Sequence, residues 1–261
     1  YLLFALSYRS TAYAMLSQHG KALEDMQKVQ NIIKQNPTFS EHISLLSILG
    51  DAYYHLGEFE TALTIQLKIL KLRFNLNRLD NVDQTYYQLG NAYFNLQRYN
   101  DAYNAYWEAK QYAEKKAAPI YAAYAGQGLA LTLQYQQQYS QATAELHQAK
   151  KIFHQHNLTV PYLETLIILA QISRETKQFP ASLHYLIEAE KISENVHLNK
   201  HYIVLYQLLA QMYVEQGLYD SAYFWQKKYS QALLRISPSA PIKMWVKYKN
   251  KTLSTALRLE S

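Results

Sequence analysis

Apolar and polar residues alternate along this chain with the period of an α-helix. In the stretch YYQLGNAYFNLQRYNDAYNAYWEAK, residues 86–110, apolar side chains recur every three or four positions on both sides of QRYN. This spacing predicts two amphipathic helices joined by a short turn. Gly90 lies in the middle of the first helix, where glycine costs about 1 kcal/mol relative to alanine. We therefore expect a neighbouring backbone to approach closely at that position.

The same pattern returns every forty residues, in three columns that keep their phase through the chain without an insertion. Two columns hold small residues and the third holds rings. The members are Ser10, Gly50, Gly90, Ala130, Ala170 and Ala210; then Ala22, Ala62, Ala102, Ala142, Ser182 and Ala222; then His19, Phe59, Tyr99, Tyr139, Phe179 and Tyr219. A period of this length indicates an array of repeats.

Each repeat is predicted to be a pair of helices, A and B, and the fold class to be all-α. We expect one domain, a right-handed superhelical solenoid of six helix-turn-helix repeats with a C-terminal capping helix, which makes thirteen helices and no sheet. Prolines fall in the predicted connections or, for Pro180, in the first turn of a helix. The repeats are predicted at about 1–36, 41–76, 81–116, 121–156, 161–196 and 201–236, and the cap at 239–260.

The residues at fixed places in these units resemble those of the tetratricopeptide repeat (TPR) family. The family pattern has Leu, Gly or Ala, and Tyr in helix A, an aromatic residue at the turn and Ala in helix B. Three units supply it: Leu89, Gly90, Tyr93, Tyr99, Ala102, Tyr106 and Ala109; Leu49, Gly50, Tyr53, Gly57, Phe59 and Ala62; and Leu209, Ala210, Tyr213, Gly217, Tyr219 and Ala222. The period of 40 is longer than the family's usual 34, and the first unit departs from the pattern at Arg9 and Ser10.

Charge and composition restrict the function only loosely. The net charge is +6, and residues 221–259 hold eight basic residues and no acidic one. Such a segment could contact anionic lipid or nucleic acid, but its apolar positions Met244, Tyr248, Leu253 and Leu257 favour a solvated capping helix, so no nucleic acid is expected. The chain has no cysteine and no apolar run of about 20 residues. Both ends interrupt apolar helical patterns, which indicates a fragment of a longer protein.

No motif for catalysis or for a cofactor occurs, so we predict a non-catalytic chain without cofactors. P-loop, dinucleotide-binding, nucleophile-elbow and zinc-protease patterns are absent, and the glycines of GQGLA at Gly126 lie within a predicted helix. Two histidine pairs, His154 with His156 and His197 with His201, have no carboxylate or cysteine arranged to complete a metal site. We interpret them as surface histidines.

The inner face of the A helices is the predicted binding surface. Three columns share one helical face: Thr11, Asp51, Asn91, Leu131, Gln171 and Gln211; Ser7, Ser47, Tyr87, Gln127, Ile167 and Gln207; and Ala14, Tyr54, Phe94, Gln134, Arg174 and Val214. Amides at the repeat period could bind the backbone of an extended peptide, and aromatic residues could form pockets; alternatively, these amides only solvate an exposed face. The predicted ligand-binding residues are Asp51, Tyr54, Tyr87, Asn91, Phe94, Gln127, Gln134, Tyr135, Gln171, Arg174, Gln207 and Gln211.

The TPR resemblance implies a module that binds a protein or an extended peptide. The lysine and asparagine clamp with which some members bind chaperone tails is not expected, because the matching positions hold no lysine. The longer repeats resemble the extracytoplasmic sensor regions of bacterial membrane-bound diguanylate cyclases and sensor kinases. This resemblance implies a periplasmic sensor with a membrane contacted only through segments outside this chain, although a lysine-rich end before a membrane span is typical of the cytoplasmic side. The alternative is a cytosolic peptide-responsive regulator or scaffold, and a homodimer through Trp107, Trp225 or Trp245 stays open.

Overall fold

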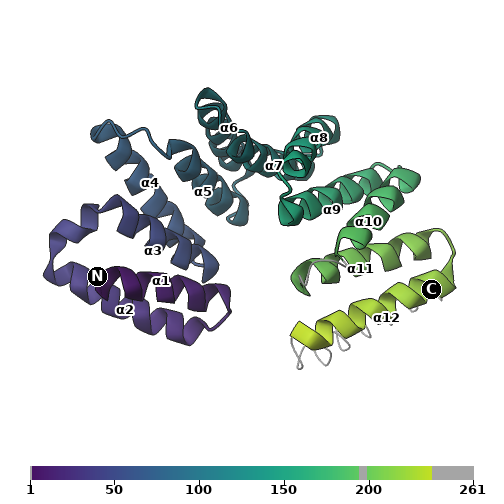
Figure 1. Cartoon of the computed structure of the whole chain (residues 1–261), viewed down its shortest axis with the longest axis horizontal. Helices are drawn as coiled ribbons and strands as arrows, with labels where there is room; N and C mark the ends of the chain where they lie inside the picture. The colour runs from purple at the N-terminus through teal and green to yellow at the C-terminus, as the bar shows by residue number, and fades with distance from the viewer. Residues whose placement is uncertain (1, 194–198, 237–261) are drawn as a thin grey trace, which may run out of the picture. The chain divides into compact units, whose positions relative to one another are not determined.

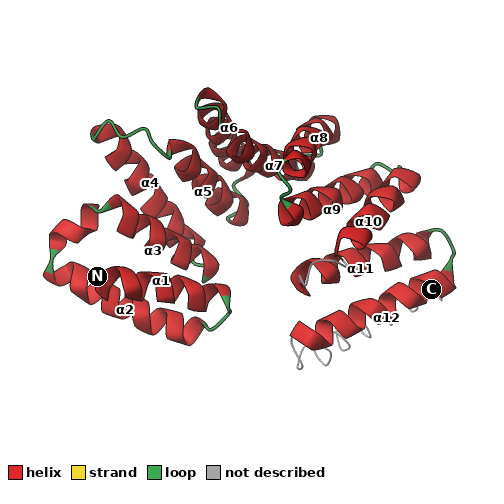
Figure 2. Ribbon diagram, in the orientation of Figure 1, coloured by secondary structure: helices red, strands yellow, loops and turns green. Residues whose placement is uncertain are grey.

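Helices make up the structure. The computed structural model describes residues 2–193 and 199–236, and no strand occurs in those ranges (Figure 2). The helices are α1 (Leu2–Met15), α2 (His19–Gln35), η1 (Pro37–Glu41), α3 (Ile43–His55), α4 (Phe59–Asn75), α5 (Val82–Asn95), α6 (Tyr99–Lys115), α7 (Pro119–Tyr135), α8 (Tyr139–Gln155), α9 (Thr159–Glu175), α10 (Phe179–Ser193), α11 (Asn199–Glu215) and α12 (Tyr219–Ile236) (Figure 1). The all-α repeat fold is confirmed, whereas the predicted capping helix at 239–260 lies outside the described residues.

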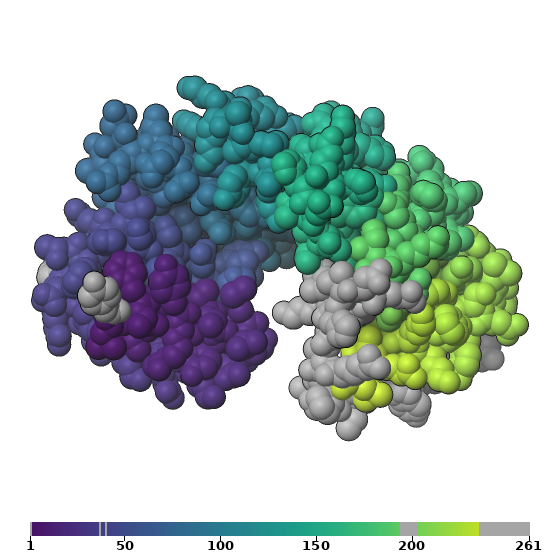
Figure 3. Space-filling view, viewed as in Figure 1, coloured from purple at the N-terminus to yellow at the C-terminus, as the bar shows by residue number. Residues whose placement is uncertain are grey.

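The chain forms two compact units, residues 1–156 and 157–261. The first, here the N-terminal unit, contains α1–α8, and the second, the C-terminal unit, contains α9–α12. Within each unit most helix contacts join consecutive helices, and α1 also packs on α3, α5 on α7 and α9 on α11. Side chains of successive helix pairs in the N-terminal unit meet in a continuous surface (Figure 3). Each unit is therefore a stack of helix pairs whose core grows with every added pair.

The ring column marks where the B helices begin. His19, Phe59, Tyr99, Tyr139, Phe179 and Tyr219 are the first residues of the six B helices. Both small-residue columns are buried at every member. The A and B helices thus alternate in the structure with the forty-residue period of the sequence, because the contacts between A and B helices repeat with it.

The turns between A and B helices share one backbone geometry. The second residue of each turn has a positive φ, and it is Ser17, Gly57, Gln97, Gln137, Lys177 or Gly217. Around Gly57, the Gly57 amide donates to the carbonyl of Tyr54 and the Glu58 amide donates to the carbonyl of Tyr53. Those are the bonds of a Schellman cap, which satisfies the last carbonyls of a helix. Glycine, which tolerates positive φ best, occupies only two of these six positions.

Gly90 is required by a side chain and not by a backbone, which corrects our expectation. A Cβ at position 90 would lie 2.5 Å from Cδ1 of Tyr106, and the same ring also fills the space beside Gly128. Tyr106 of α6 is therefore inserted between α5 and α7, and it is almost fully buried. A methyl group at either glycine would collide with this ring.

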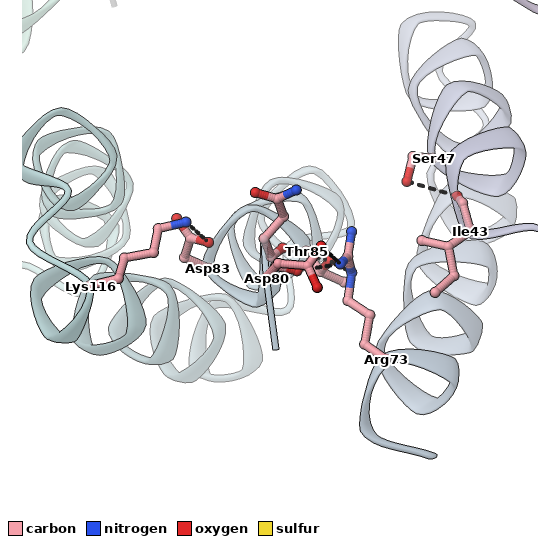
Figure 4. A network of polar contacts seen from close by, with 8 residues as sticks. Ile43, Ser47, Arg73, Asp80, Asp83, Thr85 and Lys116 are labelled. Atoms are coloured by element: carbon pink, nitrogen blue, oxygen red, sulfur yellow. Dashed lines mark hydrogen bonds and ion pairs between the residues drawn. The ribbon is translucent and has the colours of Figure 1, made fainter. Parts of the chain in front are cut away.

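Polar contacts hold the beginning of α5 between the ends of α4 and α6 (Figure 4). From α4, the buried Arg73 donates to the Thr85 hydroxyl at 3.1 Å and to the backbone carbonyl of Asp80. From the end of α6, the Lys116 ammonium lies 2.6 Å from Oδ1 of Asp83. The junction is thus fixed by side chains from both neighbouring B helices, which position the A-helix face described below.

The first repeat has Arg9 where the other repeats have leucine, and the structure explains this difference. Arg9 of α1 donates two hydrogen bonds to the Asp25 carboxylate of α2, at 2.7 and 2.8 Å. Asp25 is buried, and the hydrogen bonds from Arg9 lower the pKa of its carboxyl group. A paired arginine therefore replaces the leucine of the other repeats at the contact between these two helices.

Candidate functional site

The predicted face of the N-terminal unit carries a chain of tyrosine and amide hydrogen bonds. The Tyr106 hydroxyl donates to Oδ1 of Asn91 at 2.8 Å. One turn further along α5, Nδ2 of Asn95 donates to the Tyr54 hydroxyl at 3.0 Å, and this bond joins α5 to α3. Burial raises the pKa of both Tyr54 and Tyr106. Both phenols therefore stay protonated over the physiological pH range and keep their hydrogen bonds.

The orientation of Asn91 has a consequence for recognition. Its Oδ1 accepts from Tyr106, and its Nδ2 donor makes only a long contact of 3.5 Å with Oε1 of Gln88. Asn91 is half-buried. An amide held in this way can donate to a peptide carbonyl without losing much side-chain entropy on binding. The structure thus supplies an orientation for the proposed backbone reader that the sequence did not.

Aromatic residues of the predicted set gather near the ends of α5 and α7. The rings of Phe94 and Tyr135 meet edge to face, with centroids 5.2 Å apart, and Tyr99 stacks on Tyr135 at 4.9 Å. Tyr135 is 59% exposed, whereas Phe94 is half-buried. These rings form an exposed apolar platform suited to an apolar ligand side chain.

Three further predicted residues differ in accessibility. Gln127 of α7 is buried, with 6% of its surface exposed, so it offers little surface to a ligand. Gln134, two turns further along the same helix, is half-buried. Asp51 of α3 is also half-buried, and this burial raises the pKa of its carboxyl group to about 6. Asp51 is therefore partly protonated near neutral pH, unlike an ordinary aspartate.

The C-terminal unit carries the remaining predicted residues on α9 and α11. Gln171, Gln207 and Gln211 are half-buried there. Arg174 donates to Oε1 of Gln211 and to Oε1 of Glu215, each at 3.0 Å. Since Arg174 already has an internal carboxylate partner, a ligand carboxylate would have to compete with Glu215. The structure therefore joins Arg174 to Gln211, a contact that the sequence columns did not predict.

A cleft between α5 and α7 adds residues that the sequence analysis missed. It measures about 270 Å³ and is lined by Asp83, Gln84, Tyr87, Gln88, Tyr121 and Tyr124. Tyr87, the predicted member, lies 5.8 Å from the Tyr106 ring and 6.2 Å from the Tyr124 ring. Gln84 and Tyr124 are one repeat apart and lie one turn before the predicted columns. Continuing the columns by one turn toward the start of each A helix would have found them.

A second, more polar cleft lies beside α6 in the same unit. Its volume is about 460 Å³ and its lining is Asn100, Tyr103, Asn104, Gln136 and Gln138. Gln136 donates to Oδ1 of Asn100 at 3.0 Å across it. The lining consists of uncharged hydrogen-bonding groups, and none of them belongs to the predicted face.

No group of three or more His, Cys, Asp or Glu side chains arranged for a metal ion occurs in the part of the chain that the structure describes. Of the histidine pairs, His154 and His156 lie at the end of α8, whereas His197 lies outside the described residues. Within residues 2–193 and 199–236, none of the helices combines the length and apolarity that a membrane span requires.

The tryptophans proposed for a dimer contact lie in different settings. Trp107 of α6 is 45% exposed. Trp225 of α12 packs against Tyr206 and Phe224 and has the Lys228 ammonium over its ring, 4.5 Å from the centroid. Trp245 lies outside the described residues. A homodimer stays a prediction.

The repeated helix pairs and the face they expose define the class of fold as TPR-like. No protein-family model matches the sequence, and no curated protein matches it. Solved structures do match.

A signal-transduction ATPase with a tetratricopeptide repeat sensor from Pyrococcus horikoshii has a TM-score of 0.68 and 16% identity, over 94% of this chain and 38% of that one. The protein BtubC from P. vanneervenii has a TM-score of 0.64 and 16% identity, over 88% of this chain and 92% of the other. A Rap conjugation gene regulator of the plasmid pLS20, in complex with a Phr peptide, has a TM-score of 0.66 and 13% identity, over 89% and 75%. At these identities the likeness establishes the TPR-like fold.

Proposed function

We propose that this chain is a non-catalytic binding module whose ligand is an extended peptide or a flexible segment of a partner protein. The observation that carries this proposal is the face of α3, α5 and α7. On it, Oδ1 of Asn91 accepts from Tyr106 while its Nδ2 makes only a long contact with Gln88, and tyrosines line an adjacent cleft. Half-buried amides on a rigid wall bind a peptide backbone with little ordering cost.

The test is a selection of ten-residue displayed peptides on the whole chain, followed by affinity measurements on variants. Replacing Asn91 with alanine should remove one hydrogen bond to the peptide, which is worth about 0.5–1.5 kcal/mol, and so weaken binding roughly two- to tenfold. Gln171→Ala tests the face of the C-terminal unit separately. Matched controls are Gln111→Ala and Gln148→Ala, because these exposed amides lie on the B helices α6 and α8.

The result would contradict the proposal if the selected peptides bound Asn91→Ala as tightly as the parent chain. Binding that was weakened by Gln111→Ala or Gln148→Ala instead would place the ligand on the B helices. A circular-dichroism melt of each variant confirms that a loss of affinity is not a loss of fold.

The biological setting is a second part of the proposal. We favour the sensor or interaction region of a larger bacterial signalling protein in the periplasm, supported by the resemblance of the 40-residue repeats to such regions. The alternative is a cytosolic peptide-responsive regulator or scaffold, and the likeness to a conjugation gene regulator in complex with a peptide supports it. Fractionation of cells that express the tagged natural protein separates the two: recovery in the periplasm or in the membrane supports the first, and recovery in the cytosol the second.

A further inference from the structure

The cleft between α5 and α7 has the size of a subsite for one side chain. Its volume of about 270 Å³ is below the roughly 300–1,000 Å³ of pockets that hold drug-sized ligands. Two helices supply its walls: Asp83, Gln84, Tyr87 and Gln88 come from α5, and Tyr121 and Tyr124 come from α7. The lining therefore consists of three phenol rings, two amides and one charged group, the Asp83 carboxylate.

Asp83 is buried, and only one of its two carboxylate oxygens has a bonding partner among the described residues. Its side chain is 2% exposed, and Oδ1 is paired with the Lys116 ammonium at 2.6 Å. Oδ2 is buried and has no hydrogen-bond partner among the described residues. An ionised oxygen that is removed from water without a partner is costly. Asp83 lines the cleft, so a donor that entered there, displaced the groups that cover Oδ2 and bonded to it would recover stability, and this need is specific to a hydrogen-bond donor.

Lys116 already places a cation at this position. It is the residue that follows α6 and does not line the cleft, yet its Nζ bonds to Asp83 and lies 5.3 Å from the centroid of the Tyr121 ring. A carboxylate and a ring face are the two partners with which proteins bind ammonium and guanidinium groups. The Lys116 side chain is 38% exposed, so it has a path to solvent if another cation takes its place.

We infer that this cleft is the subsite for an arginine side chain of the bound peptide, an inference that rests on the function proposed above. The guanidinium donates to Oδ2 of Asp83 and lies against the rings of Tyr121 and Tyr124, while the side-chain carbonyls of Gln84 and Gln88 accept its remaining N–H groups. Arginine suits the cleft better than lysine because its planar group both stacks and donates in several directions. An anionic ligand is disfavoured because the lining supplies a carboxylate. Lys116 competes with the ligand for Asp83 and so weakens its binding.

The first test uses the unmodified chain and peptides recovered by the display selection described above. We expect these peptides to carry arginine at one shared position. Replacing that arginine with citrulline keeps the shape of the side chain but removes its charge, and should weaken binding at least tenfold. Peptides without a shared basic position, or equal affinities for the arginine and citrulline forms, would overturn the subsite and leave peptide binding by the face intact. If no peptide bound, both proposals would fail.

Variants assign the preference to the cleft. Asp83→Asn should make the arginine and citrulline peptides bind alike, whereas Lys116→Met, which keeps Asp83 and removes its internal competitor, should increase the preference for arginine about three- to tenfold. The matched control is Asp101→Asn, since Asp101 pairs with Arg98 on the surface of α6 and lies outside the cleft. The assignment of this arginine preference to the cleft would be refuted if Lys116→Met left the preference unchanged. It would also be refuted if Asp101→Asn abolished the preference as fully as Asp83→Asn. The Lys116→Met result decides the question even if Asp83→Asn fails to fold.

Discussion

The Tyr106 side chain connects packing and recognition in the N-terminal unit. Its ring occupies the space that a Cβ at Gly90 or Gly128 would need, and its hydroxyl donates to the side chain of Asn91. The repeat columns predicted that position 90 must be small. They did not identify Tyr106 as the reason, because the ring belongs to a residue sixteen positions further along the chain, and only packing brings it there.

Gly90→Ala should destabilise the chain although alanine favours helices. The added methyl group would collide with Tyr106, and overpacking of this kind costs typically about 1–3 kcal/mol. The matched control is Gly20→Ala, because Gly20 lies in α2 with open space around its Cβ position; there the free energy of unfolding should stay unchanged or rise by up to about 1 kcal/mol. Urea titrations followed by circular dichroism measure both, and equal effects would contradict the role of Tyr106.

Asp51 should make stability depend on pH. Its pKa of about 6 lies above the ordinary value of about 3.9, so the folded state holds a proton that the unfolded chain releases between about pH 4 and 6. The stability from this proton is fully present below about pH 4 and is lost as the pH rises through 6. Asp51→Asn should therefore raise the melting temperature at pH 7.5 and change it little at pH 4. Asp101→Asn, at an exposed carboxylate, serves as the control, and an equal gain at both pH values would contradict the assignment.

At the scale of elements, the six turns between A and B helices show which features of a turn the sequence predicts and which it does not. The ring column, which the sequence placed at the turn, falls on the first residue of every B helix. The left-handed residue two positions before it had no such signal, because Ser17, Gln97, Gln137 and Lys177 adopt positive φ without being glycine. The cap bonds fix that conformation, and their geometry depends on the backbone rather than on the side chain.

Gly57→Ala should lower stability through the backbone alone. Gly57 has a φ of +83°, and no atom lies within 4 Å of its Cβ position, so the cost is that of a left-handed residue with a side chain, about 1–2 kcal/mol. The reverse change at the matching place in the next repeat, Gln97→Gly, should be neutral or stabilising because it removes that strain. Thermal and urea unfolding of the two variants measure the difference, and a loss of stability in both would show that the turn geometry is not the cause.

At the scale of the whole molecule, contacts run between neighbouring helices, so stability should vary along the stack. The pair α1 and α2 begins the N-terminal unit and has helical neighbours on one side among the described residues, whereas α5 and α6 have them on both sides. We expect the amides of α1 and α2 to exchange with deuterium faster than those of α5 and α6. Asp25→Ala, which removes the partner of Arg9, should accelerate exchange in α1 and α2 and leave α6 unchanged; uniform exchange along the unit would contradict this expectation.

The order of residues determined the repeat, the helix pairs and the buried small residues. These follow from local rules, since helix spacing and a constant period place side chains on a face whatever the neighbours are. Only packing decided that Tyr106 lies between two glycines and that Arg174 bonds to Glu215. Packing also pairs Lys116 with Oδ1 of Asp83 and leaves Oδ2 without a hydrogen-bond partner among the described residues. Each of those contacts joins residues on different helices, and its geometry depends on how the helices cross and on which rotamers fit between them.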